Sequence, residues 1–195
     1  RKTGYPNHSI NNLKLTIMKR EDIKPLPEYF DKYINKVENI PVLEALEISL
    51  RELETLPVDA YEKLGNNVYE PGKWTVKDIL QHLIDTERVF SYRATAFSRN
   101  ETGQVLSFDE GLYVAQADAN RRSLQELIQE LKTVRRSFIE LYKSFTPEML
   151  LRKGKGFKGE YSVLSIGFII PGHQRWHLEV LEERYFPLLK TSVKH

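Results

Sequence analysis

Two of the chain's five histidines, His173 and His177, stand four residues apart in the segment "IIPGHQRWHLEVLEERY" (residues 169–185). Side chains at this spacing lie one above the other on the same face of an α-helix, so their ring nitrogens can reach one point. Buried imidazoles need polar partners, and either a metal ion or hydrogen-bonding core residues would satisfy this pair. The rest of that helix face is apolar, and consists of Ile166, Ile170, Val180 and Leu181.

A third histidine can complete a metal site. His82 lies in another helical segment, at the edge of the stripe made by Ile79 and Leu83, where a packed or half-exposed residue is the alternative. Two facing helices of a bundle can supply ligands to one ion between them. Three neutral imidazoles with one open position suit Zn or Ni and resemble a catalytic rather than a closed structural site. We therefore predict that His82, His173 and His177 bind a divalent metal.

The same sequence excludes several other chemistries. It contains no cysteine, which rules out thiolate ligands, disulfides and a cysteine nucleophile. A zinc-protease helix carries a glutamate directly after its first histidine, but here that residue is Gln174. No serine-hydrolase elbow, phosphate-binding loop or dinucleotide fingerprint is found in the sequence.

Composition limits the expected partners. The 29 basic and 27 acidic residues give a net charge of +2 without a basic stripe, so we expect neither nucleic acid nor a membrane surface as partner. No apolar run reaches the roughly 18 residues of a membrane span, and no apolar secretory segment opens the chain. A small-molecule substrate and a cytoplasmic location are the default expectations.

Four segments carry the apolar periodicity of helices, at about 28–55, 76–99, 122–145 and 163–185. Thr75, with Asp78 three residues on, predicts the start of the second segment. A long connection, residues 100–120, separates the second segment from the third. We therefore predict an all-α four-helix bundle. The basic, glycine-rich run "RKGKGFKGE" predicts a solvated loop or a small hairpin.

The start of the chain differs from the rest. Residues 1–27 form a polar N-terminal extension, and residues 28–195 form the predicted bundle domain. Residues 1–17 are aperiodic and precede Met18, so we expect Met18 to be the native start and residues 1–17 to be an upstream addition. His8, in this stretch, and the terminal His195 are therefore left out of the predicted site.

Three stretches, "PGKWTVKDILQHLIDTERVFSYRATAFSRN", "FDEGLYV" and "GHQRWHLEVLEERY", resemble the DinB/YfiT-like superfamily of metalloenzymes over residues 28–188. The resemblance implies an up-down-down-up four-helix bundle, often dimeric. It also implies a divalent metal held by three histidines, one from the second helix and two from the last. The positions that match this pattern are His82, His173 and His177.

Two positions depart from the family pattern. Pro171 stands where relatives usually carry a small, helix-compatible residue. An interior proline removes a backbone hydrogen bond, here to the carbonyl of Gly167, and Gly172 follows it, so we expect a bend or a helix restart before the ligands. Position 176 is Trp, where close relatives often have another histidine. Neither change removes a predicted ligand.

The resemblance implies two chemistries. One is transfer of a low-molecular-weight thiol, such as bacillithiol or mycothiol, to or from an electrophile, and this is our leading expectation. The other is hydrolysis by a metal-bound hydroxide, which also needs a general base. A non-catalytic metal-binding bundle is the third alternative, which a metal site without an adjoining pocket would favour.

Three carboxylates are candidates for the base or for contacts that support the metal ligands. Asp85 lies one turn from His82, while Asp109 and Glu110 belong to the long connection, which must cross the mouth of the bundle. A solvated surface role is the alternative for each. Two further residues, Tyr92 and Arg93, could contact substrate or serve only the core or surface. The sequence predicts core positions for Trp74 and Phe90.

Overall fold

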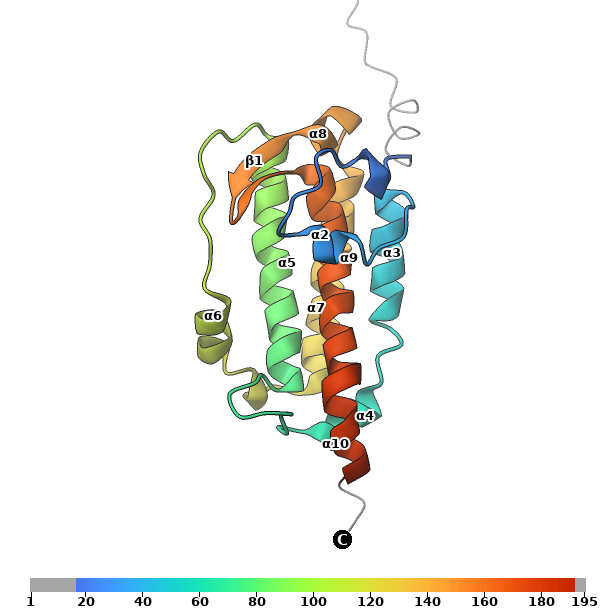
Figure 1. Cartoon of the computed structure of the whole chain (residues 1–195), viewed down its shortest axis with the longest axis vertical. Helices are drawn as coiled ribbons and strands as arrows, with labels where there is room; N and C mark the ends of the chain where they lie inside the picture. Colours follow the sequence, from blue (N-terminus) through green and yellow to red (C-terminus); the bar gives the residue numbers. More distant parts are fainter. Residues whose placement is uncertain (1–16, 192–195) are drawn as a thin grey trace, which may run out of the picture.

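The computed structural model describes residues 17–191, and four long helices form its frame (Figure 1). They are α3 (Val42–Glu52), α5 (Val76–Ser98), α7 (Leu124–Lys143) and α9 (Val163–Val180). The predicted all-α four-helix bundle is thus confirmed, while the up-down-down-up order stays a prediction. No helix within residues 17–191 is long and apolar enough to cross a membrane.

Side-chain caps define where the long helices begin. Thr75 accepts a hydrogen bond from the backbone N–H of Asp78, whose carboxylate accepts one from the backbone N–H of Thr75 in return. Ser123 and Glu126 form the same reciprocal pair at the start of α7. Ser162 caps α9 by accepting from the N–H of Ser165. Such caps satisfy backbone donors that have no partner inside the helix, so these short polar residues fix the helix starts.

Shorter elements fill the connections. In the long connection, Asp109 caps α6, a helix that the sequence analysis did not predict and of which only Val114 is buried. The predicted small hairpin is confirmed, with Lys153 opposite Ser162 in an antiparallel pair. The short elements are η1 (Arg20–Asp22), α2 (Asp31–Ile34), α4 (Val58–Leu64), α6 (Glu110–Ala117), η2 (Ala119–Arg121), α8 (Pro147–Leu151), β1 (Lys153–Gly156), β2 (Gly159–Ser162), η3 (Leu181–Tyr185) and α10 (Phe186–Thr191).

The described part of the N-terminal extension packs against the bundle. Residues 1–16 lie outside the described residues, but Ile23 is buried and Met18 packs against the same apolar cluster. The N–H of Val42, at the start of α3, donates to the carbonyl of Met18. Part of residues 17–27 therefore packs on the bundle, while the division of the chain at residue 28 stays a prediction.

The apolar core is divided into two clusters along the bundle axis. One cluster contains Phe90 and Phe97 of α5 together with Phe138 of α7. The other contains Leu80 of α5 and Leu127 of α7, nearer the opposite ends of the same helices. Between the two clusters, each long helix carries buried polar side chains instead of apolar ones.

That polar layer is organised around a buried ion pair between α5 and α7. Arg135 Nε donates to Glu87 Oε1 at 2.7 Å and Nη2 donates to Oε2 at 3.1 Å, so the pairing is bidentate. Arg135 Nη1 also donates to the hydroxyl of Ser49 on α3. From α9, Gln174 Nε2 donates to the carbonyl of Ser49 at 2.9 Å and to Glu52 Oε2 at 3.0 Å. One hydrogen-bonded network therefore connects all four long helices.

Helix α9 continues through Pro171 without a break, so the restart that we considered there is not found. The glycine beside the proline has a clear steric role. A Cβ atom at Gly172 would lie 1.9 Å from the carbonyl oxygen of Tyr33, which is far inside contact distance. The α2 segment can lie against α9 only because position 172 has no side chain.

We expect the Glu87→Leu variant to lose about 3–5 kcal/mol of unfolding free energy, because it leaves the Arg135 charge buried and unpaired. The double variant Glu87→Leu/Arg135→Leu should recover most of that loss, since apolar residues of similar size often replace a buried pair without harm. Urea unfolding followed by circular dichroism measures both.

The matched control is Glu140→Leu on α7, which breaks the exposed ion pair between Glu140 and Lys143. Exposed ion pairs contribute little to stability, so the free energy of unfolding of this control variant should differ from that of the wild type by less than about 1 kcal/mol. A Glu87→Leu variant as stable as this control would contradict the role given to the buried pair.

Candidate metal centre

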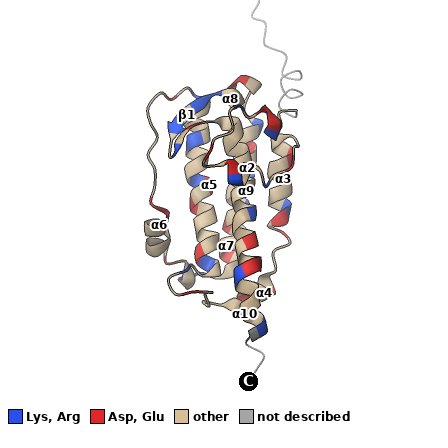
Figure 2. Cartoon of the chain, viewed as in Figure 1, with Lys and Arg blue, Asp and Glu red and all other residues tan. Residues whose placement is uncertain are grey.

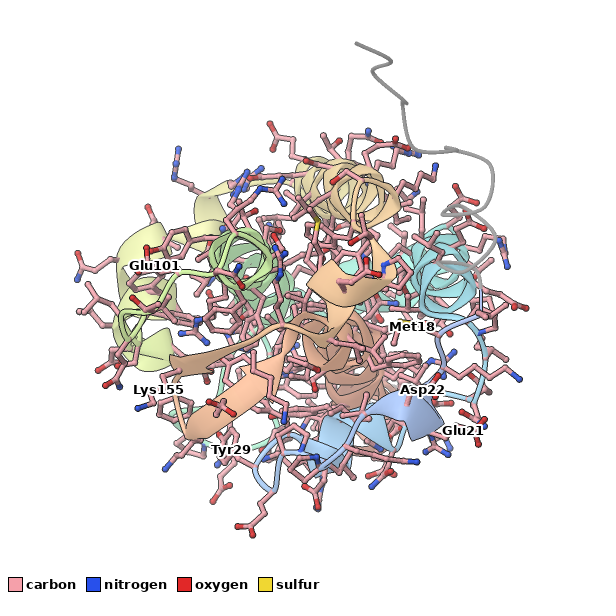
Figure 3. All side chains as sticks on the ribbon, turned by 90° about the horizontal axis from the view of Figure 1, so that it is seen from above. Met18, Glu21, Asp22, Tyr29, Glu101 and Lys155 are labelled. Atoms are coloured by element: carbon pink, nitrogen blue, oxygen red, sulfur yellow. The ribbon has the colours of Figure 1, made fainter. Side chains whose placement is uncertain are left out.

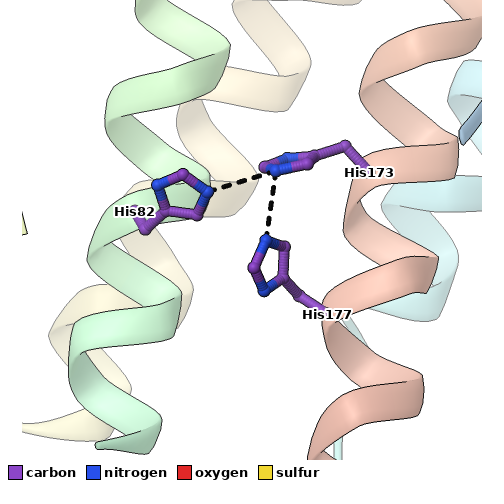
Figure 4. A group of neighbouring side chains, drawn as sticks. All are labelled: His82, His173 and His177. Carbon is purple, nitrogen blue, oxygen red and sulfur yellow. Dashed lines mark hydrogen bonds between the residues drawn. The ribbon is translucent and has the colours of Figure 1, made fainter. Parts of the chain in front are cut away.

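The three predicted histidine ligands meet between α5 and α9 (Figure 4). His82 points from α5 toward His173 and His177 of α9. His173 Nε2 lies 3.1 Å from His82 Nε2 and 3.1 Å from His177 Nε2. One ligand atom from each histidine lies within 4.8 Å of the other two. The structure therefore brings together residues that are about 90 positions apart in the sequence.

The geometry fits a bound cation better than it fits hydrogen bonding among the rings. A neutral imidazole carries one N–H, so the Nε2 atom of His173 cannot donate to both neighbours, and as an acceptor it would have to share its single lone pair between them. If every Nε2 is instead unprotonated, three lone pairs face one another without a donor. A tetrahedral ion with bonds of about 2.0–2.1 Å separates its ligand nitrogens by about 3.3 Å, close to the spacing of His173 from its two partners.

Burial keeps these imidazoles unprotonated. Desolvation lowers the pKa of His82 to about 3, with a smaller contribution from the nearby His177. Desolvation likewise lowers the pKa of His177 to about 4 and holds the pKa of His173 well below its ordinary value. Metal ions bind the neutral form of histidine, so the cluster is ready to coordinate at neutral pH.

Aromatic rings enclose the histidine cluster on two sides. The Trp74 ring centroid lies 4.9 Å from that of His82, and the Trp74 ring stacks on His177 at 6.4 Å. The Tyr33 ring meets His173 edge-on at 5.1 Å. The sequence analysis predicted Trp74 only as core and did not single out Tyr33, because its contact depends on how α2 lies across α9.

A cavity of about 330 Å³ adjoins His173. The side chain of Thr86 also lines it, and its hydroxyl lies 3.5 Å from His82 Nδ1. The cavity wall is largely aromatic, with a few polar groups. It comprises Tyr29, Phe30, Tyr33, Thr86, Phe90, Arg93, Phe108, Asp109, Glu110, Gly111, Phe157, Ile169 and His173.

The long connection brings two of the predicted carboxylates to this cavity. Asp109 Oδ1 accepts a hydrogen bond from the N–H of Leu112 at 2.9 Å, so it caps α6 as well as lining the wall. Glu110 is an exposed residue, yet partial desolvation of its carboxyl group raises the pKa, and the positive charge of Lys32 offsets part of that rise.

The third predicted carboxylate, Asp85, lies elsewhere. It is half-buried, accepts a hydrogen bond from Gln81 Nε2 at 3.0 Å, and lines a separate cavity of about 440 Å³ with Arg122. Its predicted chemical role stays a prediction. On the same helix, Tyr92 is 60% exposed, whereas Arg93 is buried in the wall of the cavity beside His173.

A second cavity also borders the cluster, at His177. A cavity of about 260 Å³ is lined by His177 and Trp74, together with Tyr69, Ile79 and Tyr185. The histidine cluster is thus bordered by one cavity at His173 and by another at His177. Two separate molecules could approach the same centre from these two directions.

Comparisons with known proteins agree with this arrangement. The family model described as the DinB superfamily matches residues 43–181. Among solved structures, the fold is similar to YfiT from Bacillus subtilis, described as a probable metal-dependent hydrolase with an unusual four-helix bundle topology. The two share 19% sequence identity and a TM-score of 0.61 over 83% of this chain and 88% of that chain. The comparison with curated proteins found no match.

We expect the purified protein to bind one zinc or nickel ion, and each single variant, His82→Ala, His173→Ala or His177→Ala, to weaken binding by more than about 100-fold. Loss of a direct ligand should exceed the 10- to 100-fold loss that is typical of groups behind the ligands. Competition with a chromophoric chelator measures the affinity. The control variant Asp85→Asn should bind like the wild type. Metal affinity equal to that of the wild type in the His173→Ala/His177→Ala variant would refute the site.

We also expect the metal-free protein to lose stability as the pH falls from 7 toward 4. The unfolded chain takes up protons on these histidines near pH 6.5, whereas the folded chain does so only near pH 4 and below. The unfolded state therefore binds more protons in this window, and stability rises with pH there. Urea unfolding in the presence of a chelator should show this increase of the unfolding free energy with pH. The increase should be smaller in the His82→Gln variant. Equal slopes would mean that His82 titrates normally in the folded chain.

Proposed function

Because this chain belongs to the DinB superfamily, we propose that it is a metal-dependent hydrolase of a small molecule, with Zn or Ni held by His82, His173 and His177. One observation carries the proposal. The histidine cluster borders an aromatic cavity whose wall also holds the carboxyl group of Glu110. A metal site without such a cavity would have favoured a non-catalytic bundle.

The donor set suits a catalytic ion. Three neutral imidazoles leave the full charge of a divalent ion uncompensated and keep a position free for another ligand. Such an ion acts as a Lewis acid and lowers the pKa of a water or thiol that binds to it. Everything else in the reaction must come from the side chains around the cavity.

Glu110 is the best placed proton acceptor. Burial raises the pKa of its carboxyl group above the ordinary value, which is the direction that favours proton uptake by a general base. Asp109 supports it indirectly, because its cap on α6 fixes the backbone from which Glu110 projects. In this proposal Glu110 accepts the proton of the attacking nucleophile, and Asp109 is a positioning residue.

The walls of the cavity would orient the substrate and limit the access of water. Phe30, Phe90 and Ile169 are buried, and Tyr33 bridges the cavity and the ring of His173. An apolar wall strengthens electrostatic interactions within the site and favours substrates with an apolar body. The description of YfiT as a probable hydrolase is in keeping with this reading.

Thiol transfer is the second candidate, and one observation favours it. The cavity at His177, lined by Trp74 and Tyr185, gives a second route to the same histidines. A transfer reaction must hold a low-molecular-weight thiol and an electrophile at once, and two cavities could accommodate them separately. Hydrolysis needs only one organic substrate, so it leaves the cavity at His177 without a role.

The test is a panel of small esters and amides, and of thiol–electrophile pairs, assayed with the zinc- or nickel-loaded protein. We expect hydrolysis that disappears after chelation and in His173→Ala. Glu110→Gln should lower kcat by about 100-fold or more, as expected for loss of a general base, while metal affinity stays unchanged.

Asp85→Asn provides the comparison, because Asp85 was an equal candidate from the sequence but lines another cavity. We expect its kcat to stay within about twofold of the wild type. Thiol-dependent turnover without hydrolysis would select the second candidate. A metal-loaded protein that turns over neither class would leave the non-catalytic alternative.

A further inference from the structure

Two arginines of the described chain are almost completely buried, and they differ in their partners. Arg93 and Arg135 are each 1% exposed. Arg135 forms the bidentate ion pair with Glu87. Arg93 instead donates only to neutral acceptors, the hydroxyl of Tyr161 at 3.2 Å and the carbonyl of Leu106 at 3.1 Å. Within residues 17–191, its Nε–H has no hydrogen-bond partner, and its guanidinium forms no ion pair at contact distance, although its charge acts on the carboxyl group of Glu110 and lowers its pKa.

An unpaired guanidinium is unfavourable in such a place. A buried charge must be paired, or its removal from water is left uncompensated. The ring of Phe90, 4.7 Å from the guanidinium carbon, provides a cation–π contact but no hydrogen-bond acceptor. Arg93 nevertheless lies in the wall of the cavity that reaches His173. An anion in that cavity would supply the missing partner.

We infer that the cavity beside His173 recognises the carboxylate of an amphipathic substrate, and that Arg93 is the residue that selects it. This inference rests on the proposed function only in taking the cavity to be the substrate site. The rest of the substrate must be apolar, because most of the cavity wall consists of aromatic and aliphatic side chains.

Two lysines near the cavity offset the carboxylates of Asp109 and Glu110 in its wall. Lys32 Nζ lies 4.8 Å from the centre of the Tyr29 ring, and Lys158 Nζ lies 5.0 Å from that of Phe157, so two cations stand over rings of the wall. Lysines and arginines are frequent on the hairpin around β1 (Figure 2), and Tyr29 lies beside this hairpin when the bundle is viewed from above (Figure 3). These cations would attract an anion toward the entrance.

The position of Arg93 also limits the shape of the substrate. Arg93 lies eleven residues after His82 on α5, which corresponds to about 16 Å along an α-helix. Because the backbone of Arg93 stands several turns along α5 from that of His82, we expect the carboxylate and the reacting bond to lie at different ends of the substrate. Glu110 and Asp109 in the same wall would repel a doubly charged group, so a carboxylate fits this wall better than a phosphate.

The test compares 3-phenylpropanoate with the neutral 3-phenylpropanamide, using calorimetry on the zinc-loaded protein and on the chelated protein. We expect the carboxylate to bind at least about 10-fold more tightly in both, the usual effect of a hydrogen bond to a charged group. In Arg93→Gln the two ligands should bind equally, while Arg93→Lys should keep part of the preference. Arg99→Gln, which removes an exposed guanidinium directly after the end of α5 and outside the cavity, should behave like the wild type.

Nuclear magnetic resonance provides a readout that needs no variant. The Nε–H resonance of Arg93 should shift when the carboxylate binds and stay in place with the amide. The inference would be overturned if the wild type bound the carboxylate and the amide equally well, or did not bind the carboxylate at all. It would also be overturned if a folded Arg93→Gln variant still preferred the carboxylate. Failure of the proposed function would give a different result. A protein that binds no metal or hydrolyses no substrate would still prefer the carboxylate over the amide when it is tested in the presence of chelator.

Discussion

The ion pair between Glu87 and Arg135 is the interaction on which the rest of this bundle depends. It lies between two apolar clusters and binds α5 to α7, while Ser49 and Gln174 extend the same network to α3 and α9. Apolar packing alone would allow one helix to slide along another by a turn. A buried, fully directional network makes such a shift costly, because it would leave charges without partners.

This network and the histidine cluster share one layer of the structure. Gln174 directly follows His173 in α9, and Glu87 lies five residues after His82 in α5. The contacts that fix the relative height of α5 and α9 therefore also fix the meeting point of the three imidazoles. In the proposed reaction the three imidazoles would hold the metal, and the side chains around the cavity, Arg93 and Glu110 above all, would determine which molecule is acted on.

Much of this arrangement could be predicted from the sequence, because local rules govern it. Caps at Thr75 and Ser162 mark helix starts, and the spacing of His173 and His177 places them on one face. Features that depend on tertiary contacts could not be predicted. Helix α6 buries only Val114, so its sequence lacks the regular spacing of apolar residues from which a helix is predicted. Asp85 and His82 are one turn apart, yet spacing alone could not show that Asp85 lines another cavity.

The absence of a side chain at Gly172 has a further consequence. The carbonyl of Tyr33 lies against this residue, which directly precedes His173, while the ring of Tyr33 lines the cavity beside His173 and meets the imidazole of His173. A side chain at position 172 would therefore displace Tyr33 from α9. The same substitution would remove a ring from the cavity wall and from the packing of His173, although residue 172 touches neither the cavity nor the imidazoles itself.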